Sequence, residues 1–252
     1  MSTVIAVVNQ KGGVGKTTTT VNVAAQLASA SKPILIVDLD PQGNATSGLG
    51  ILKDSAKVTT YDVLCRDAKL STAVHATSTP GLYVLPANAN LAGAEVELVA
   101  KTNREYALKQ ALEENTYSYV FIDCPPSLGL LTINGLTAAS NVLIPVQAEY
   151  YALEGLSQLL NTIQAVKQSV NPNLALLGIA ITMYDKRTSL ADQVVGELTN
   201  YFGDGLFDTY IPRNVRLAEA PSFGQTIFEH DKWSKGARAY KALAAEVRKR
   251  TS

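Results

Sequence analysis

The sequence predicts an α/β fold in which a doubly wound, mostly parallel sheet carries helices on both faces. Short apolar runs rich in Val and Ile alternate with longer segments of helical period, which is the pattern of a parallel sheet covered by helices. Several of these runs are apolar throughout, as expected when both faces of the sheet are buried. No repeat, low-complexity segment or Pro/Ser-rich linker interrupts the chain, which favours a single domain over residues 1–252.

The candidate strands are the short apolar runs, taken in chain order. They lie at residues 4–9, 34–40, 82–86, 119–123, 142–146, 176–183 and 209–211. The candidate helices lie at residues 16–30, 94–114, 130–139, 153–169, 189–201 and 236–250. An apolar stripe along one face predicts a single amphipathic helix over 94–114. The members of this stripe are Val96, Val99, Leu108 and Leu112.

The composition excludes several classes of protein. The 252 residues include 22 Lys+Arg, 22 Asp+Glu and two cysteines. A formal charge of zero argues against a uniformly basic nucleic-acid coat, and two cysteines cannot build a disulfide framework, which favours a reducing environment. The apolar run at residues 4–8 precedes Lys11, the reverse of a secretory signal, and no apolar run approaches the roughly 18–20 residues of a membrane helix. We therefore expect a cytoplasmic protein without a membrane partner.

Positive charge is concentrated near the end of the sequence. Residues 232–252 contain seven basic residues and one acidic residue, a local balance of +6. These are Lys232, Lys235, Arg238, Lys241, Arg248, Lys249 and Arg250 against Glu246. Two explanations stay open: a solvated helix whose cations complement its dipole, or a binding surface.

The most informative segment is the glycine-rich loop VVNQKGGVGKTT at residues 7–18, which follows a predicted strand and precedes a predicted helix. Its glycines permit backbone conformations in which successive N–H groups face a phosphate. Lys16 would contact the β- and γ-phosphates, and Thr17 would give its hydroxyl to Mg²⁺. The positive end of the following helix points at the same anion. ATP and Mg²⁺ are thus the expected cofactors, and the loop residues assigned to the nucleotide on this basis are Gly12, Gly13, Val14, Gly15, Lys16, Thr17 and Thr18.

The loop departs from the strict phosphate-loop pattern, because Gln10 stands where the first glycine would be. A second lysine, Lys11, opens the loop instead. In this respect the chain resembles the deviant Walker A group of P-loop NTPases, whose loop reads K-G-G-x-G-K-[ST]. The resemblance implies that Lys11 is the signature lysine, which reaches across a dimer interface to the nucleotide held by the partner subunit.

Carboxylates follow two of the predicted strands. Asp38 and Asp40 end one strand and share one side of the chain, and Asp123 ends another just before two prolines. Because ligands bind outside the carboxyl ends of parallel strands, these acids should converge on the glycine-rich loop. Phosphoryl transfer needs Mg²⁺ ligands and a group that positions the attacking water. The acids are therefore candidates for both tasks.

The run DLDPQGNAT at residues 38–46 narrows the resemblance to the chromosome- and plasmid-partitioning ATPases of the ParA/Soj type. The resemblance implies that Asp40 activates water, that Asp123 is the Walker B acid, and that Asp38 supports them. The catalytic candidates are then Lys11, Lys16 and Asp40, and the metal-site candidates are Thr17, Asp40 and Asp123. With no arginine finger evident, we expect slow hydrolysis by the isolated protein.

Further similarity to this family covers most of the chain, in the segments DCPPSLG, YDKRT, IPRNVRLAEAPS and SKGA. It implies that Pro212 and Asn214 contact adenine and that Arg187 and Arg216 contact DNA. From the residues alone, the first two form a turn and the arginines are surface cations. The segment SFGQ at residues 222–225 stands where relatives often have a histidine and a lysine, so the DNA footprint could shift toward the C-terminal basic residues.

The resemblance also implies partners. An ATP-dependent homodimer would bind double-stranded DNA non-specifically, through phosphate neutralisation, and would be nucleoid-associated. A centromere-binding protein of the ParB/Spo0J type would stimulate hydrolysis. The cargo could be a chromosome or a plasmid.

Three other functions are weighed against this one. A membrane-associated positioning ATPase of the MinD type would need a terminal amphipathic helix, whereas the stripe Tyr240, Leu243 and Val247 is better explained as core packing. A redox iron protein would need cluster-ligating cysteines, and Cys65 and Cys124 lack the expected setting. A scaffold that binds ATP without hydrolysing it is disfavoured by the acid at position 40.

Overall fold

The computed structural model describes residues 2–149 and 152–252. In these ranges a seven-stranded sheet has the order β3-β4-β2-β5-β1-β6-β7. All neighbouring strands are parallel except β3, which pairs antiparallel with β4 at one edge. The strands are β1 (Thr3–Val7), β2 (Ile34–Asp38), β3 (His75–Ala76), β4 (Leu82–Leu85), β5 (Tyr119–Asp123), β6 (Asn141–Gln147) and β7 (Ala175–Thr182).

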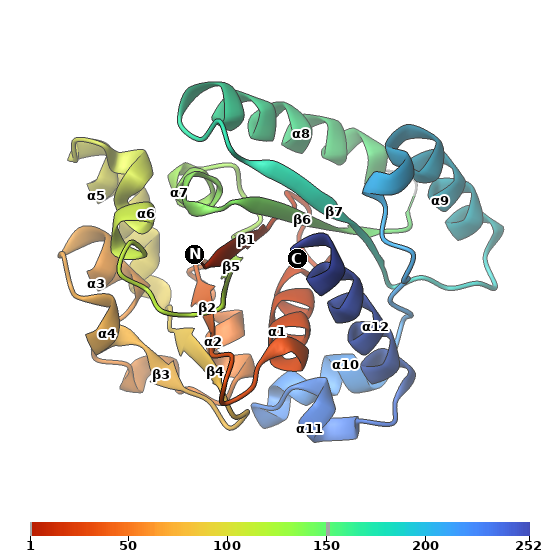
Figure 1. Cartoon of the computed structure of the whole chain (residues 1–252), viewed down its shortest axis with the longest axis horizontal. Coiled ribbons are helices and arrows are strands. Elements are labelled where there is room, and N and C mark those ends of the chain that lie inside the picture. The colour runs from red at the N-terminus through yellow and green to blue at the C-terminus, as the bar shows by residue number, and fades with distance from the viewer. Residues whose placement is uncertain (1, 150–151) are drawn as a thin grey trace.

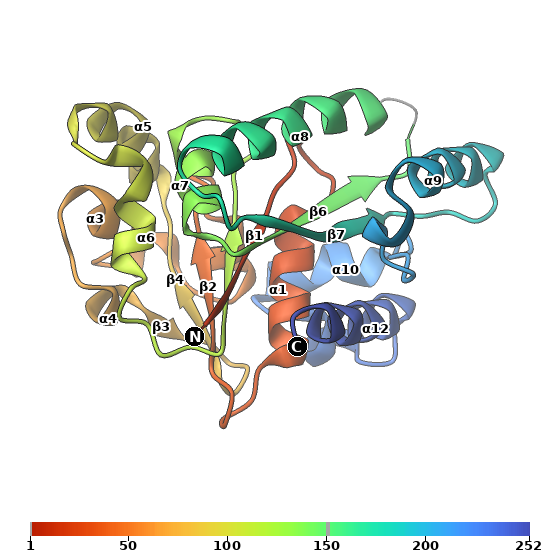
Figure 2. The same ribbon diagram turned by 45° about the horizontal axis from the view of Figure 1, so that its top comes forward.

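Helices cover both faces of the sheet, as the sequence predicts. Figures 1 and 2 show α7 and α8 on one side of the central strands and α1 and α12 on the other. The helices are α1 (Lys16–Leu27), α2 (Asn44–Gly48), α3 (Thr60–Cys65), α4 (Leu70–Ala73), α5 (Ala94–Glu97), α6 (Ala107–Ala111), α7 (Leu130–Ala138), α8 (Ala152–Ser169), α9 (Ser189–Phe202), α10 (Val215–Glu219), α11 (Ile227–Asp231) and α12 (Lys235–Arg250). The predicted doubly wound fold is confirmed.

Two hydrophobic cores lie on opposite faces of the sheet. Leu35 and Val37 of β2 belong to the core beneath α7 and α8, whereas Ile34 and Ile36 belong to the core beneath α1 and α12. Alternate residues of one strand point to opposite faces, so a strand that is apolar throughout fills both cores. This arrangement leaves the carboxyl ends of β1, β2 and β5 at one edge of the sheet.

The predicted strand at 209–211 is wrong. Residues 207–211 donate only two backbone hydrogen bonds to β7 among the described residues, from Phe207 and Ile211 to the carbonyls of Ile179 and Ile181. The intervening N–H groups of Asp208 and Thr209 donate instead to the carboxylate of Glu246 in α12, at 2.9 and 3.0 Å. The Thr209 N–H, which a continuous ladder with Phe207 and Ile211 needs, is therefore taken by a side chain. The sheet still has seven strands, because β3 (His75–Ala76), which was not predicted from the sequence, takes the place of the strand expected at 209–211 in the count.

The single helix predicted at 94–114 is also wrong. Lys101 has extended backbone angles and Asn103 is left-handed, with φ of 56°. Buried Asn134 of α7 holds the chain beyond this break, accepting from the Leu108 N–H at 3.1 Å and donating to the Arg104 carbonyl at 2.8 Å. Of the predicted apolar stripe, Leu108 and Leu112 are buried, whereas Val96 and Val99 are 76% and 57% exposed.

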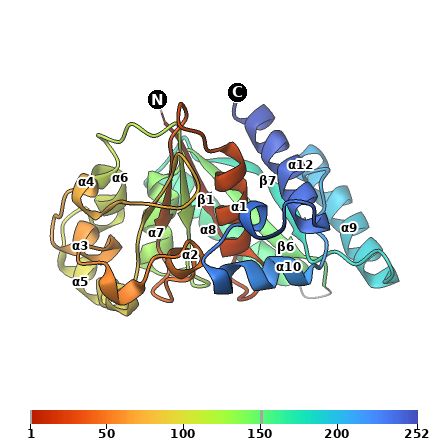
Figure 3. The same cartoon turned by 90° about the horizontal axis from the view of Figure 1, so that it is seen from below.

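The final helix, α12, matches its prediction. Tyr240, Leu243 and Val247 are buried in the core shared with α1, and Figure 3 shows α1, α10 and α12 on the same side of the molecule. None of the helices within the described ranges is long and apolar enough to cross a membrane.

Candidate nucleotide site

The glycine-rich loop joins the buried strand β1 to helix α1. Gly13 and Gly15 have φ of 76° and 88°, a conformation that favours glycine, and Gly15 directly precedes the helix. Thr182, at the end of β7, donates a hydrogen bond from its hydroxyl to the Val14 carbonyl at 2.8 Å. The loop is thus fixed from behind, and the N-terminus of α1 points its free N–H groups toward the cavity described below.

Lys16 is the first residue of α1 and is only 7% exposed. Its Nζ donates to the Lys11 carbonyl at 3.2 Å, so the two lysines of the loop are linked. Burial lowers the pKa of the Lys16 ammonium, while the nearby carboxylates of Asp123 and Asp40 oppose this shift. A buried ammonium at the N-terminus of a helix is suited to hold a polyanion such as a nucleotide phosphate chain.

Asp123 and Asp38 lie side by side on neighbouring strands. They are register partners of β5 and β2, and both are fully buried. Asp123 accepts hydrogen bonds from the hydroxyls of Thr17 at 2.7 Å and Thr20 at 3.2 Å. Asp38 accepts from the Thr46 hydroxyl at 2.6 Å and the Thr46 N–H at 2.8 Å. Burial, reinforced by the neighbouring acid, raises the pKa of Asp123 to about 8.

Asp40 lies just beyond the end of β2 and faces the cavity. Its Oδ1 accepts the Gln42 N–H at 2.8 Å, and its carbonyl accepts the Gly43 N–H at 2.8 Å, so a turn fixes the carboxylate. It is 7% exposed. Of the acids that the sequence predicts here, Asp40 lines the cavity, whereas Asp38 lies behind it, bonded to Thr46.

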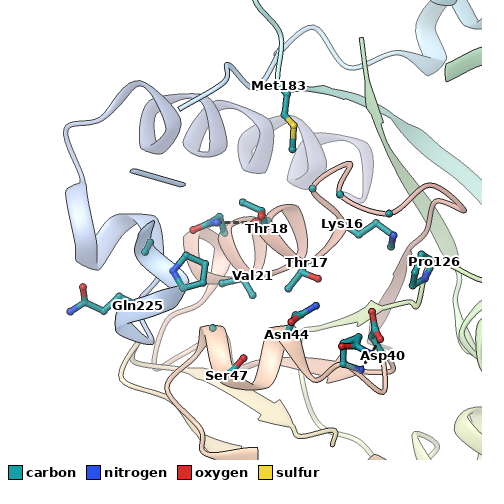
Figure 4. A pocket seen from close by; sticks show the side chains of 18 residues that line it. Lys16, Thr17, Thr18, Val21, Asp40, Asn44, Ser47, Pro126, Met183 and Gln225 are labelled. Atoms are coloured by element: carbon teal, nitrogen blue, oxygen red, sulfur yellow. Dashed lines mark hydrogen bonds between the residues drawn. The ribbon is translucent and has the colours of Figure 1, made fainter. Parts of the chain in front are cut away.

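A cavity of about 480 Å³ opens at these strand ends. Figure 4 shows Lys16 and Thr17 from the start of α1, and Asp40 from beyond the end of β2, pointing into it. The predicted residues that line it are Gly12, Gly13, Gly15, Lys16, Thr17, Thr18 and Asp40. A second cavity of about 170 Å³ shares Gly15, Thr18 and Met183 with the first, and it is lined by Pro212 and Asn214.

Several lining residues carry no role in the sequence analysis. Gln42, Asn44 and Ser47 come from the turn after β2 and from α2, and Gln225 comes from the loop before α11. Gln42 and Asn44 belong to the run at 38–46, so that motif was the available signal. No sequence signal points to Met183, because its position depends on how β7 packs against the loop.

Lys11 lies outside the cavity lining. Its ammonium forms an ion pair with Glu149 at 2.5 Å, and the two side chains are 44% and 45% exposed. The Lys11 N–H donates to the side chain of Asn9 at 2.9 Å, which holds the backbone of the loop rather than the ammonium. The lysine that the sequence assigns to a partner's nucleotide is therefore at the surface.

The two arginines assigned to DNA are surface residues with acidic partners. Arg187 is 84% exposed and forms an ion pair with Asp185 at 2.6 Å, which holds the pKa of that carboxyl well below its usual range. Arg216 of α10 is 56% exposed and forms ion pairs with Glu219 at 2.8 Å and Asp231 at 3.7 Å. Neither arginine lines the two cavities.

The oxygen donors at the site are compatible with Mg²⁺. Thr17, Asp40 and Asp123 offer hydroxyl and carboxylate oxygens, the ligand type that this ion prefers. Across the described residues, no group of three or more His, Cys, Asp or Glu side chains could hold a metal on its own. The donor set therefore fits an ion that keeps waters and shares phosphate oxygens. Cys65 and Cys124 are free thiols, and burial raises the pKa of Cys124.

Comparison with known proteins connects this geometry to a family. A family model for an AAA domain matches residues 2–176. The chain is 55% identical over 249 residues to the sporulation initiation inhibitor protein Soj of Bacillus subtilis, over 98% of both chains. It is 54% identical to the chromosome partitioning protein ParA of Myxococcus xanthus, over 98% of this chain and 88% of that protein.

A solved structure extends the comparison to the fold. Cobyrinic acid a,c-diamide synthase from Mycobacterium smegmatis, with an ATP analogue and magnesium bound, has a TM-score of 0.84 and 42% identity, over 97% of this chain and 93% of that one. Three observations lead to the same family: the P-loop at the end of β1, the acids at the ends of β2 and β5, and relatives that match nearly the whole chain. The chain belongs to the ParA/Soj family of P-loop partitioning ATPases.

Proposed function

We propose that this protein is a Mg²⁺-dependent ATPase, folded as one P-loop domain over residues 1–252, that drives chromosome or plasmid partitioning in the cytoplasm. The carrying observation is the convergence of Lys16, Thr17 and Asp40 on one cavity, with Asp123 hydrogen-bonded to Thr17. The relatives at 55% and 54% identity bear sporulation and partitioning names, so we follow them rather than the synthase name of the structure at 42% identity.

Each site residue has a role that its position supports. Backbone N–H groups of the loop bind phosphate oxygens, and the buried ammonium of Lys16 neutralises charge that grows on the β- and γ-phosphates during transfer. Thr17 and Asp123 would hold Mg²⁺, which would supply further charge stabilisation when bound. Asp40 accepts a hydrogen bond from the attacking water and orients it in line. With a carboxylate as the only base and no arginine added, turnover by the isolated protein is slow.

Lys11 completes the site of a second copy in this proposal. Its ammonium is half exposed, and among the described residues it is held by Glu149 alone. Exposed ion pairs contribute about 0–1 kcal/mol, so exchanging Glu149 for a partner's nucleotide costs little. ATP then favours a homodimer in which each Lys11 reaches the other subunit's phosphates, and hydrolysis releases that dimer. A ParB/Spo0J-type partner accelerates this step.

The DNA-binding surface of the ATP-bound dimer includes Arg187, Arg216 and the exposed face of α12. The exposed cations of α12 are Lys235, Arg238, Lys241, Arg248 and Lys249, and Lys232 precedes the helix. None of the ion pairs among the described residues involves them. Cations without acidic partners are available for DNA phosphates, which supports non-specific binding and association with the nucleoid.

The MinD-type membrane function is less well supported. A helix that lies in the lipid interface must keep a bulky apolar face free. In α12 the apolar residues Tyr240, Leu243 and Val247 are buried against α1, and the exposed side is basic. Sedimentation with liposomes in the presence of ATP tests this alternative, and we expect no lipid-dependent pelleting.

Asp40→Ala tests the proposed function. DNA co-sedimentation is compared with ATP, with ADP and without nucleotide, alongside ATP turnover, for the wild type, Asp40→Ala and the exposed-acid control Asp54→Ala. We expect wild type and control to hydrolyse ATP and pellet with DNA only in ATP. Asp40→Ala should lose at least about 100-fold in turnover while still binding ATP and DNA. Normal hydrolysis by Asp40→Ala would contradict the water-orienting role of Asp40. If the wild-type protein failed to pellet with DNA in ATP, in ADP and without nucleotide, the proposed partitioning function would be contradicted.

A further inference from the structure

Glu95 of α5 binds the N-terminus of another helix, α7. Its two carboxylate oxygens accept the N–H groups of Leu130 at 2.9 Å and Leu131 at 3.2 Å. Figures 1 and 2 show α5 next to α7. The first N–H groups of a helix lack partners within the helix, and its dipole favours a negative charge beside them. Gly129, the residue before α7, has no side chain to fill this place, so an acid from another helix fills it.

The local geometry leaves room for this carboxylate. A Cβ atom at Gly129 would lie 2.5 Å from Glu95 Oε1 and 2.8 Å from Oε2, closer than real Cβ atoms approach, so a larger residue would displace the acid. The φ of Gly129 is −77°, so its backbone does not require glycine. Within the described ranges no ion pair involves Glu95. Its charge is therefore directed at the start of α7.

The bound helix end is also the end of a loop that leaves the nucleotide site. Residues 124–129 join Asp123, at the end of β5, to α7. Pro126 of this loop lines the 480 Å³ cavity, and Figure 4 shows it among the side chains around that cavity. At the start of the loop the Cys124 N–H donates to the last carbonyl of β1 at 3.2 Å. Glu95 holds the other end.

The segment that carries Glu95 contacts a second wall of the same cavity. It runs from the end of β4 to α5, and the Ala87 N–H at its start donates to the Thr46 hydroxyl at 2.9 Å. Thr46 belongs to α2, which lines the cavity through Asn44 and Ser47. A cap that only stabilised α7 would not need an acid from this segment, because a Ser, Thr, Asp or Asn at the N-cap itself would satisfy the same N–H groups.

We propose that Glu95 is a positioning residue for ATP hydrolysis, whose carboxylate fixes the loop at residues 124–129 relative to α2. The proposal rests on the proposed function, in which Asp123 and Asp40 serve the reaction from these two sides. Glu95 lines neither cavity, so it acts on turnover through the loop. ATP binding depends less on it, because Thr182 anchors the phosphate loop separately. A misplacement of about 1 Å in reacting groups can cost about 100-fold in rate.

The first test separates turnover from binding. Steady-state hydrolysis and calorimetric titration with ATP and Mg²⁺ compare the wild type, Glu95→Ala, Glu95→Gln and the exposed-acid control Glu113→Ala, below the melting temperature of each. We expect Glu95→Ala to lower kcat about 10- to 100-fold, while KM and the Kd for ATP stay within about threefold. Glu95→Gln keeps one acceptor and loses the charge, so its kcat should fall between those of the wild type and Glu95→Ala. The control should match the wild type.

A second-site variant separates positioning from helix capping. Removing the Glu95 side chain vacates the space beside Gly129, so Gly129→Ser can give α7 an N-cap of its own in the Glu95→Ala background. We expect the double variant to regain the melting temperature that Glu95→Ala loses, while its kcat stays about tenfold or more below that of the wild type. The reason is that a serine cap does not connect the loop to the segment before α5. A kcat restored together with stability would reduce Glu95 to a helix cap and overturn the proposal.

The remaining outcomes distinguish this proposal from the proposed function. A wild-type kcat in both Glu95→Ala and Glu95→Gln would overturn the positioning role while the ATPase function stands. ATP binding weakened as much as kcat would also overturn it, because Glu95 would then act on the phosphate loop. Wild-type protein that neither binds nor hydrolyses ATP would overturn both. If Glu95→Ala does not fold, Glu95→Gln decides, and a kcat equal to that of the wild type contradicts the proposal.

Discussion

At the scale of single residues, the site is dominated by two buried carboxyl groups that lie close together. Asp38 and Asp123 are register partners on β2 and β5 and have no exposed surface. Burial is the main cause that raises the pKa of Asp38 to about 6 and of Asp123 to about 8. In the nucleotide-free protein the pKa of Asp123 therefore lies well above the usual carboxyl range, and the hydroxyl of Thr17 and the ammonium of Lys16 offset only part of the cost of its charge.

This electrostatic arrangement makes stability depend on pH. A carboxyl whose folded pKa lies above its unfolded value binds more protons in the folded state, so the free energy of unfolding falls as pH rises from about 4 to about 8. Asp123→Asn keeps an oxygen for Thr17 without the charge. We expect it to raise the melting temperature of the nucleotide-free protein by several degrees at pH 8 and by much less at pH 5, where Asp123 is protonated in any case.

Thermal melts across pH 5–8 measure this effect, with exposed Asp54→Asn as the matched control. The pH dependence of the melting temperature that remains in Asp123→Asn is due to Asp38, and it should be confined to pH values below about 6. Parallel melting curves for the wild type and Asp123→Asn over the whole range would contradict the assignment.

At the scale of elements, α12 carries two kinds of arginine and lysine. Arg250 donates to the carbonyls of Leu177 at 3.0 Å and Leu206 at 2.6 Å, and its guanidinium lies 4.1 Å from the centre of the Phe207 ring. It ties the end of the helix to β7 and to the segment beside that strand. Its neighbour Lys249 is exposed and makes no such contact. The basic tail, which looks uniform in the sequence, is thus partly structural.

Arg250→Ala should therefore destabilise the fold. Removing the guanidinium leaves two partly buried carbonyls without their donor and loses the ring contact, and we expect a loss of about 1–3 kcal/mol in the free energy of unfolding. Lys249→Ala should change it by less than about 0.5 kcal/mol. Urea unfolding measures the free energy of unfolding of both variants, fitted with one common slope of that free energy against urea concentration. Equal changes in the free energy of unfolding for Arg250→Ala and Lys249→Ala would mean that Arg250 contributes no more than a solvated cation.

The sequence predicted those elements whose formation depends on local pattern. The strands β1, β2 and β5 and the loop before Lys16 have apolar runs and glycines that specify them directly. The break within residues 94–114 could not be predicted, because Asn134, far along the chain, binds Leu108 and Arg104. The segment at 209–211 is likewise decided by Glu246 of α12.

The candidate site divides in the same way. The phosphate loop and Asp40 are local motifs, and their convergence follows from the parallel strands. Met183 is different, because its position and its left-handed backbone, with φ of 51°, depend on hydrogen bonds that its neighbours make to Val14 and Ile211, which come from two other parts of the chain. A sequence pattern cannot carry that information.

At the scale of the whole molecule, equal numbers of acidic and basic residues conceal an uneven surface. Arg187 and Arg216 have acidic partners, whereas the exposed cations of α12 have none among the described residues. Figure 3 shows the helices α10 and α12 on the same side of the molecule. A protein without net charge has no general attraction to DNA, and two copies of this face brought together by ATP would bind more strongly than one.

The salt dependence of DNA binding decides how much α12 contributes. Each phosphate contact adds about 0.9 to the slope of log K against log salt. In ATP, Lys235→Ala and Arg238→Ala should each lower this slope by about 1 and weaken binding to duplexes of unrelated sequence alike. Arg216→Ala should lower it less, because Glu219 and Asp231 already compensate the arginine. Lys167→Ala, an exposed lysine of α8 on the other face of the sheet, is the matched control. Slopes that stay at the wild-type value for both α12 variants, with ATP turnover intact, would remove Lys235 and Arg238 from the DNA surface.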